Sequence, residues 1–245
     1  MARYKLIVAY DGTNYNGFAR QPNGVTVVET LEEAVEKIVQ HKVYILGAGR
    51  TDTGVHAAGQ CCIFDSETKV PVERLAKAIN SQLPKDISVQ SVEKVSDEFH
   101  PRFGAKRKTY RYQILNAKQR SPFLDKYTLL YPYEMDLDKM RLAAEKMVGT
   151  HDFKCFCSSK TDVQDTVRTI YDINIYQQDE LVTVDICGNG FLYNMVRIII
   201  GTLLKVNEGK LEPNDITRVI ESKERNLAGP TAPPQGLTML KIIYE

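Results

Sequence analysis

The chain has 245 residues, and 43% of them are hydrophobic, so it can bury the core of one large domain or two small ones. Its formal net charge is only +1, and affinity for a polyanion would therefore require clustered cations. The most apolar stretch, residues 191–204, is interrupted by Asn194 and Arg197 and is too short to span a membrane. Because the first residues lack the long apolar core of a secretory signal, we expect a cytoplasmic protein.

The first hundred residues predict the order βαββαβ. Residues 4–10 form a strand, and apolar residues then recur at helical spacing over 28–39, after a capping box made by Thr26 and Glu29. Strands near 42–48 and 58–65, a helix opened by Pro71 and a strand over 87–95 complete the order. This succession is typical of a ferredoxin-like unit.

The rest of the chain predicts a second such unit with additions. Its expected elements are strands at 109–115 and near 126–131, a helix at 136–148, strands at 168–176 and 181–187, helices over 190–206 and from Pro213, and a strand at 238–244. We therefore expect an α/β (α+β) fold with ferredoxin-like halves at 1–104 and 105–245. We also expect their sheets to join into one mixed, mostly antiparallel sheet with a central cleft.

One carboxylate, Asp52, lies in a glycine-flanked turn within residues 47–57, directly after an apolar run. Glycine permits backbone angles that other residues resist, and Arg50 can keep a nearby carboxylate ionised even where burial would neutralise it. The pattern indicates an active-site loop. The ordinary alternative is a turn residue whose side chain binds backbone amides.

The cysteines and histidines give little support to a metal site. The five cysteines are an odd number in a chain without an export signal, which favours free thiols. His151, Cys155 and Cys157 are close in sequence, but no second pair of ligands stands at the spacing of a tetrahedral zinc site. We expect no bound metal.

Positive charge is concentrated in residues 100–120, which contain no Asp or Glu. The seven cations are Arg102, Lys106, Arg107, Lys108, Arg111, Lys118 and Arg120. Phe103, Tyr110 and Tyr112 are interleaved with them, and cations beside aromatic side chains suit phosphates beside unstacked bases. The alternative is a solvated connection between the halves, with the tyrosines in the core.

Arg197 is a charge inside an apolar helical stretch, and a buried guanidinium requires an anion. Asp52 is one candidate for that anion. Asp172 and Asp185, on predicted strands of the second half, could instead form a purely structural pair with Arg197, and the residues alone leave this choice open.

Two functions can be set against an Asp52-dependent RNA enzyme. Asp52-Thr53-Gly54 is the signature tripeptide of aspartic proteases, but the chain has one copy, and Arg50 would disfavour the shared proton that those enzymes need. A noncatalytic RNA-binding module would also suit ferredoxin-like halves. However, neither half carries the aromatic signature of an RNA-recognition motif, and that function leaves Asp52 unexplained.

Residues 49–57 resemble the catalytic loop of the TruA family of tRNA pseudouridine synthases. Other segments resemble that family's further motifs in the same order: residues 10–18, residues 99–105 with Tyr110, residues 191–197 with 201–203, and residues 232–237. The resemblance thus spans nearly the whole chain. The chain departs from the pattern at Ala19 and Val28, where many members have glutamine.

This resemblance implies an isomerase that converts uridine to pseudouridine at tRNA positions 38, 39 and 40, in the anticodon arm, as a homodimer without cofactor or metal. It assigns to Asp52 the carboxylate that attacks the sugar or the base or takes a proton from the sugar, with Arg197 as its partner. It implies that Arg50 holds the flipped nucleotide and that Tyr110 packs against the uracil. The cations expected to hold RNA phosphates are Lys106, Arg107, Lys108 and Arg111.

Overall fold

The computed structural model describes residues 1–158 and 163–244. The chain forms two compact units, one made of residues 1–106 with the C-terminal segment from Thr238, the other of residues 107–237. In the prediction from sequence, with halves at 1–104 and 105–245, that C-terminal segment belonged to the second half. Both units combine helices with a mostly antiparallel sheet, which confirms the mixed α/β class.

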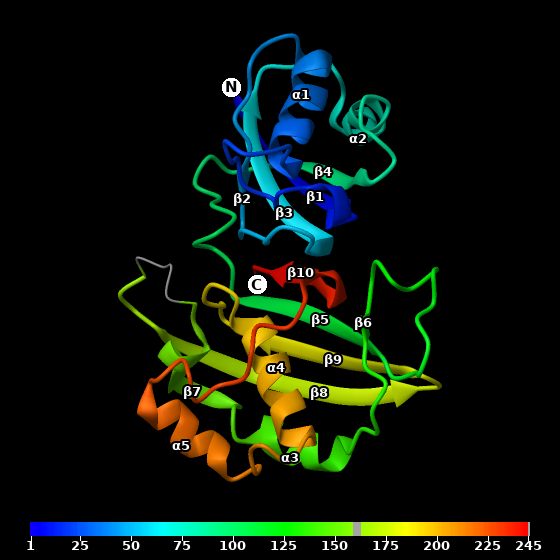
Figure 1. Ribbon diagram of the computed structural model, residues 1–245. Helices are drawn as coiled ribbons and strands as arrows, with labels where there is room; N and C mark the ends of the chain where they lie inside the picture. Colours follow the sequence, from blue (N-terminus) through cyan, green and yellow to red (C-terminus); the bar gives the residue numbers. More distant parts are fainter. Residues whose placement is uncertain (159–162, 245) are drawn as a thin grey trace. The chain divides into compact units, whose positions relative to one another are not determined.

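In the N-terminal part of the first unit, β1 lies between β4 and β3, and β2 pairs with β3; these three pairings are antiparallel. The strands are β1 (Ala2–Tyr10), β2 (Leu46–Gly47), β3 (His56–Ser66) and β4 (Ile87–Val95). Helices α1 (Val27–Val39) and α2 (Val72–Asn80) lie side by side against this sheet (Figure 1). The predicted ferredoxin-like order βαββαβ is therefore confirmed for this unit.

The C-terminal strand β10 (Leu237–Ile243) adds to β3 of the first unit. It runs parallel to β3, with Thr238 opposite His56 and Met239 opposite Ala57. At Gly59, farther along β3, a Cβ atom would lie 2.5 Å from the carbonyl oxygen of Leu240. Glycine thus permits the close approach of β10 to β3.

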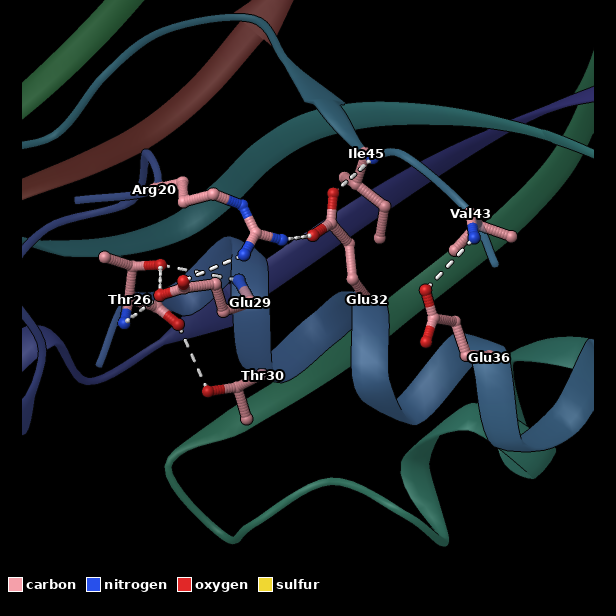
Figure 2. A network of polar contacts seen from close by, with 8 residues as sticks. All are labelled: Arg20, Thr26, Glu29, Thr30, Glu32, Glu36, Val43 and Ile45. Carbon is pink, nitrogen blue, oxygen red and sulfur yellow. Dashed lines mark hydrogen bonds and ion pairs between the residues drawn. The ribbon is translucent and has the colours of Figure 1, made fainter. Parts of the chain in front are cut away.

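The strand predicted near 42–48 is reduced to β2. Val43 and Ile45 are buried, as an alternating pattern requires, but their N–H groups donate to α1 rather than to a strand. Glu36 Oε1 accepts from Val43 at 3.2 Å, and Glu32 Oε1 accepts from Ile45 at 2.8 Å (Figure 2). This segment is held by helix carboxylates, which the sequence pattern does not reveal.

The second unit has the strand order β5-β9-β8-β7, and β6 pairs with β5. Its elements are β5 (Arg107–Leu115), β6 (Leu129–Leu130), α3 (Leu137–Glu145), β7 (Gly149–Asp152), β8 (Val167–Gln178), β9 (Leu181–Gly188), α4 (Met195–Asn207) and α5 (Asp215–Ser222). Helices α3 and α4 pack against each other, and α3 also contacts β8 (Figure 1). The predicted helices and the 181–187 hairpin strand are present, whereas β7 was not predicted.

The predicted helix over 190–206 begins later, at Met195. Asn194 precedes it with a left-handed backbone, φ +61°, so the residues just before α4 cannot continue the helix. Within the described residues, no helix combines the length and apolar character needed to cross a bilayer.

All five cysteines are free thiols, and four of them are buried. Burial raises the pKa of Cys155 to about 12, so this thiol stays protonated near neutral pH. In the part of the chain that the structure describes, no three His, Cys, Asp or Glu side chains are grouped so as to hold a metal ion. His151 Nε2 lies 3.1 Å from the carbonyl oxygen of Val148.

Candidate functional site

The Asp52 loop connects β2 to β3 in the first unit, and its backbone is fixed by hydrogen bonds at both ends. Ala48 N–H donates to Cys61 O at 2.8 Å, and Val55 N–H donates to Asp52 O at 3.1 Å. Gly54 has a φ of +77°, a conformation that favours glycine. The glycine turn inferred from the sequence is therefore present, with Asp52 partly exposed and Arg50 exposed.

Residues 10–18 pack against the Asp52 loop, and we call them the loop bed. The hydroxyl groups of Tyr10 and Thr51 lie 2.7 Å apart, and Phe18 N–H donates to Thr51 O at 3.1 Å. Gly17, with φ +86°, lies so close that a Cβ atom would be 2.5 Å from Thr51 O. From the sequence, this motif was identified only by its resemblance to the family. Its two glycines could have indicated a close contact between backbones, because glycine has no side chain.

The far end of the Asp52 loop is also held by the loop bed. His56 is buried, and its Nδ1 accepts the N–H of Gly12 at 3.0 Å. A Cβ atom on Gly12 would lie 2.0 Å from Val55 O, so glycine is required at this position as well. The loop is thus clamped on both sides of Asp52.

Helix α1 connects the loop bed to the chain that enters the Asp52 loop. At its N-terminus, Val27 N–H donates to Gly17 O at 3.1 Å and Val28 N–H to Phe18 O at 3.0 Å. The predicted capping box is present, since Thr26 and Glu29 exchange their side-chain and backbone hydrogen bonds (Figure 2). Through Glu32, the same helix binds the N–H of Ile45, which directly precedes β2.

Arg20 adds an ionic contact to this helix, at 2.9 Å from Glu29 and in closer contact with Glu32 (Figure 2). The hydrogen bond with Glu32 raises the pKa of the Arg20 guanidinium above its usual value. Arg20 lies two residues after the loop bed in the chain, so this pairing also restrains the segment that leaves the loop bed.

Tyr110 and Tyr112 share one face of β5 in the second unit but have different surroundings. The Tyr110 ring is 8% exposed and meets the edge of Phe191 with 5.2 Å between ring centroids. Tyr112 is fully buried and donates its hydroxyl to Pro233 O at 2.8 Å. Tyr112 is therefore a core residue. This is the alternative stated above, in which the tyrosines of the basic segment belong to the core.

Arg197 lies in the first turn of α4 and is partly buried. Its Nε donates to Ala232 O at 2.7 Å, and its Nη1 donates to Asn194 Oδ1 at 2.9 Å. Asp185 and Asp172 were the alternative partners of Arg197. Asp185 instead forms two 2.8 Å hydrogen bonds with Arg111, and Asp172 is exposed.

Residues 229–236 pack tightly on α4, and we call them the strap. Gly229 N–H donates to the buried Thr202 hydroxyl at 2.8 Å, and Ala232 N–H donates to Arg197 O at 3.0 Å. A Cβ atom on Gly201 would lie 1.8 Å from Pro230 O. The motifs at 191–197, 201–203 and 232–237 are therefore joined by hydrogen bonds and close packing, and together they fix the Arg197 side chain.

Comparison with protein families adds to this geometry. A family model described as tRNA pseudouridine synthase matches residues 6–104 and 143–245. The chain belongs to the tRNA pseudouridine synthase family.

Relatives named tRNA pseudouridine synthase A match this chain over its full length. Those from Thermoanaerobacter sp. (strain X514) and Exiguobacterium sp. are 46% identical over 244 and 245 residues, covering 100% of this chain and 100% and 99% of the relatives. A Listeria monocytogenes relative is 46% identical over 248 residues, with 100% coverage of both. A crystal structure of a Cbf5-Nop10-Gar1 complex aligns with a TM-score of 0.38 and 11% identity, over 96% of this chain and 47% of that chain.

The four site residues predicted from the resemblance to this family are divided between the two units. Asp52 and Arg50 belong to the first unit, and Tyr110 and Arg197 to the second. The sequence predicted these four as site residues, and that assignment stays a prediction. Tyr10, Gly17 and Thr202 were part of the quoted motifs, but the contacts by which they hold the loop and the strap were not predicted.

The four cations predicted to bind RNA are not equivalent. Lys106 and Arg107 are exposed, and the Arg107 guanidinium lies 4.8 Å from the ring centroid of Tyr171. Lys108 is partly buried. Arg111 is bound by Asp185, and this hydrogen bond raises the Arg111 pKa. A phosphate at Arg111 would therefore compete with a carboxylate already in place.

Proposed function

We propose that this chain converts uridine to pseudouridine at positions 38, 39 and 40 in the anticodon arm of tRNA. The observation that carries the proposal is the Asp52 loop, clamped by the loop bed and α1 in a chain that belongs to the tRNA pseudouridine synthase family. The reaction detaches uracil from its ribose and reattaches it through carbon. Nothing is added and nothing is lost, so the chemistry needs no cofactor or metal.

Asp52 is the proposed reacting group. An ionised carboxylate can attack the sugar or the base, or take a proton from the sugar, while charge separates across the glycosidic bond. Arg197 is the proposed partner that keeps this carboxylate ionised, because a guanidinium favours the charged form of a nearby acid. Its bonds to Ala232 and Asn194 hold the Arg197 side chain in one orientation.

The uridine must leave its stack before its sugar can meet a carboxylate, at a cost of about a few kcal/mol. Arg50, which is exposed, is proposed to hold the nucleotide out. Tyr110 is proposed to pack its ring against the uracil, a contact that contributes about 1–3 kcal/mol in comparable sites. The edge contact with Phe191 supports that ring.

Lys106, Arg107 and Lys108 are proposed to contact phosphates, which fix the register of RNA without reading its sequence. Arg111 is the weaker member of the predicted set because Asp185 already binds it. We further propose that two copies of the chain form a homodimer that cradles the tRNA, and that the enzyme acts in the cytoplasm.

The test is to incubate the purified protein with unmodified tRNA, without any added cofactor, and to map pseudouridine along the product. Wild-type protein should modify positions 38, 39 and 40. Asp52→Asn should fold and bind tRNA but form no product, because a neutral amide can neither attack nor accept the proton.

Asp179→Asn is the matched control, since Asp179 is exposed in a hairpin with φ +53°, where asparagine is equally tolerated. It should keep the wild-type rate. Appreciable product from Asp52→Asn would remove Asp52 from the mechanism, and absence of product from wild-type protein would reject the proposed function.

A further inference from the structure

Phe103 presents an aromatic ring to solvent from a fixed turn in the first unit. The residue is 80% exposed. His100 Nδ1 accepts the N–H of Arg102 at 3.1 Å and that of Phe103 at 3.2 Å, and Gly104 N–H donates to His100 O at 3.0 Å. The rings of His100 and Phe103 lie 4.3 Å apart at 30°. The exposed ring is thus held at its backbone and along one side.

The turn itself is anchored to the sheet of the first unit. The Tyr244 hydroxyl, just after β10, donates to Pro101 O at 2.8 Å, and its ring meets that of Phe99 at 4.9 Å. From β1, Arg3 Nη1 donates to Phe99 O at 3.2 Å. A ring on such a support loses little conformational freedom when a ligand binds, so its contact energy is largely retained.

The charges near Phe103 favour a polyanion. The Arg102 guanidinium lies 5.9 Å from the centre of the Phe103 ring, and Lys106 is exposed in the same segment. Residues 100–106, which include Phe103, contain Arg102 and Lys106 and no Asp or Glu. A cationic segment with an exposed flat ring suits a nucleic acid, in which each phosphate is accompanied by a base that can stack.

We propose that Phe103 is a stacking platform for an unpaired base of the tRNA substrate, with Arg102 beside the neighbouring phosphate. This base is a different one from the uridine assigned to Tyr110. The proposal rests on the proposed function for the identity of the RNA. It adds a binding residue that the family resemblance does not assign.

The chain contains no tryptophan, so Phe103→Trp would introduce a single fluorescent indole at this position. Stacking on a base should quench that fluorescence when tRNA is added. The matched control is Tyr44→Trp: Tyr44 is 83% exposed, but its neighbours Val43 and Ile45 are bound by the carboxylates of Glu36 and Glu32 (Figure 2). Position 44 lies outside the basic segment, and the Glu32 carboxylate near it is already paired with Arg20, so we expect no base to stack there.

Heparin separates stacking from simple charge attraction, since it is a polyanion without bases. The platform predicts that tRNA quenches the indole fluorescence of Phe103→Trp, that heparin changes it little, and that Tyr44→Trp responds little to either. No quenching by tRNA, equal quenching at both positions, or equal quenching by heparin would overturn it.

Affinity gives an independent measure. Phe103→Ala and Phe103→Leu should each weaken tRNA binding by roughly 5- to 100-fold, as expected for the loss of one stacked base, whereas Phe103→Tyr and Tyr44→Ala should bind as the wild type does. Wild-type affinity in Phe103→Leu would show that an apolar contact suffices and would reject stacking.

The two proposals can fail separately. Protein that binds tRNA and quenches at position 103 but makes no pseudouridine would reject the proposed function alone. Protein that makes pseudouridine with no quenching at position 103 would reject the stacking platform alone.

Discussion

Gly17 adopts a φ of +86° where the loop bed contacts the chain at Thr51 and Asp52. In Gly17→Ala, the added Cβ atom would lie 2.5 Å from Thr51 O, so the Asp52 loop must move or the loop bed must separate from it. We expect a loss of about 1–3 kcal/mol in the free energy of unfolding. Because a small misplacement of a reacting group is costly, we also expect a rate roughly 10- to 100-fold lower. Urea unfolding and single-turnover pseudouridine formation measure the two effects.

Gly209 provides the control for backbone strain alone. It has a similar φ, +69°, but a Cβ atom there would meet nothing within 4 Å. Gly209→Ala should therefore cost only about 1–2 kcal/mol of stability and leave the rate unchanged. If Gly17→Ala kept the wild-type rate as well, the idea that the loop bed positions Asp52 would be wrong.

Single residues were predictable where a local pattern defines their surroundings. The glycines around Asp52 indicated a turn, and the alternation along 109–115 placed Tyr110 and Tyr112 on one face, as the structure confirms. The pairing of Arg111 with Asp185 was not predictable, because it requires the register of β5 on β9, which is set by contacts distant in sequence.

At the scale of elements, the periodicity of apolar residues predicted the helices and the long strands, and it failed where side chains replaced strand partners. Val43 and Ile45 alternate as strand residues do, yet Glu36 and Glu32 take their N–H groups. The short strand β7 has no apolar alternation to reveal it. The placement of β10 on β3 depends on pairing across nearly the whole chain, which no local pattern encodes.

The contact between α4 and the strap gives a prediction at this scale. The buried Thr202 hydroxyl accepts the N–H of Gly229 at 2.8 Å and donates to Ile198 O at 2.7 Å. Thr202→Val keeps the shape of the side chain but leaves the Gly229 N–H without its acceptor. We expect a loss of about 1–3 kcal/mol in the free energy of unfolding, measured with urea, and a lower rate because the strap also holds Arg197.

Thr202→Ser tests whether the hydroxyl carries this effect. Serine retains the hydroxyl and loses one methyl group, so about 1 kcal/mol of stability should be lost while the rate stays near that of the wild type. Equal rates in the valine and serine variants would contradict a role for the strap in holding Arg197.

For the whole molecule, the net charge of +1 gives no general attraction to RNA, so the proposed affinity must come from the local arrangement of cations. Cations that already have an anionic partner contribute less to the affinity for RNA. Arg111, bound to Asp185, is one of these, whereas Arg107 is exposed and lies over the Tyr171 ring. Two cations can thus have the same effect on net charge and different effects on RNA binding.

Arg107→Gln and Lys69→Gln each reduce the net charge from +1 to zero, but only Arg107 lies in the basic segment; Lys69 is an exposed residue between β3 and α2. Binding of tRNA should weaken with salt, because each phosphate contact releases counterions. The slope of log Kd against log salt concentration should fall by about one unit in Arg107→Gln and stay at the wild-type value in Lys69→Gln. Filter binding at several salt concentrations measures both slopes. An equal fall of the slope in both variants would mean that total charge, rather than this segment, governs the encounter with RNA, and a wild-type slope in Arg107→Gln would show that Arg107 makes no phosphate contact.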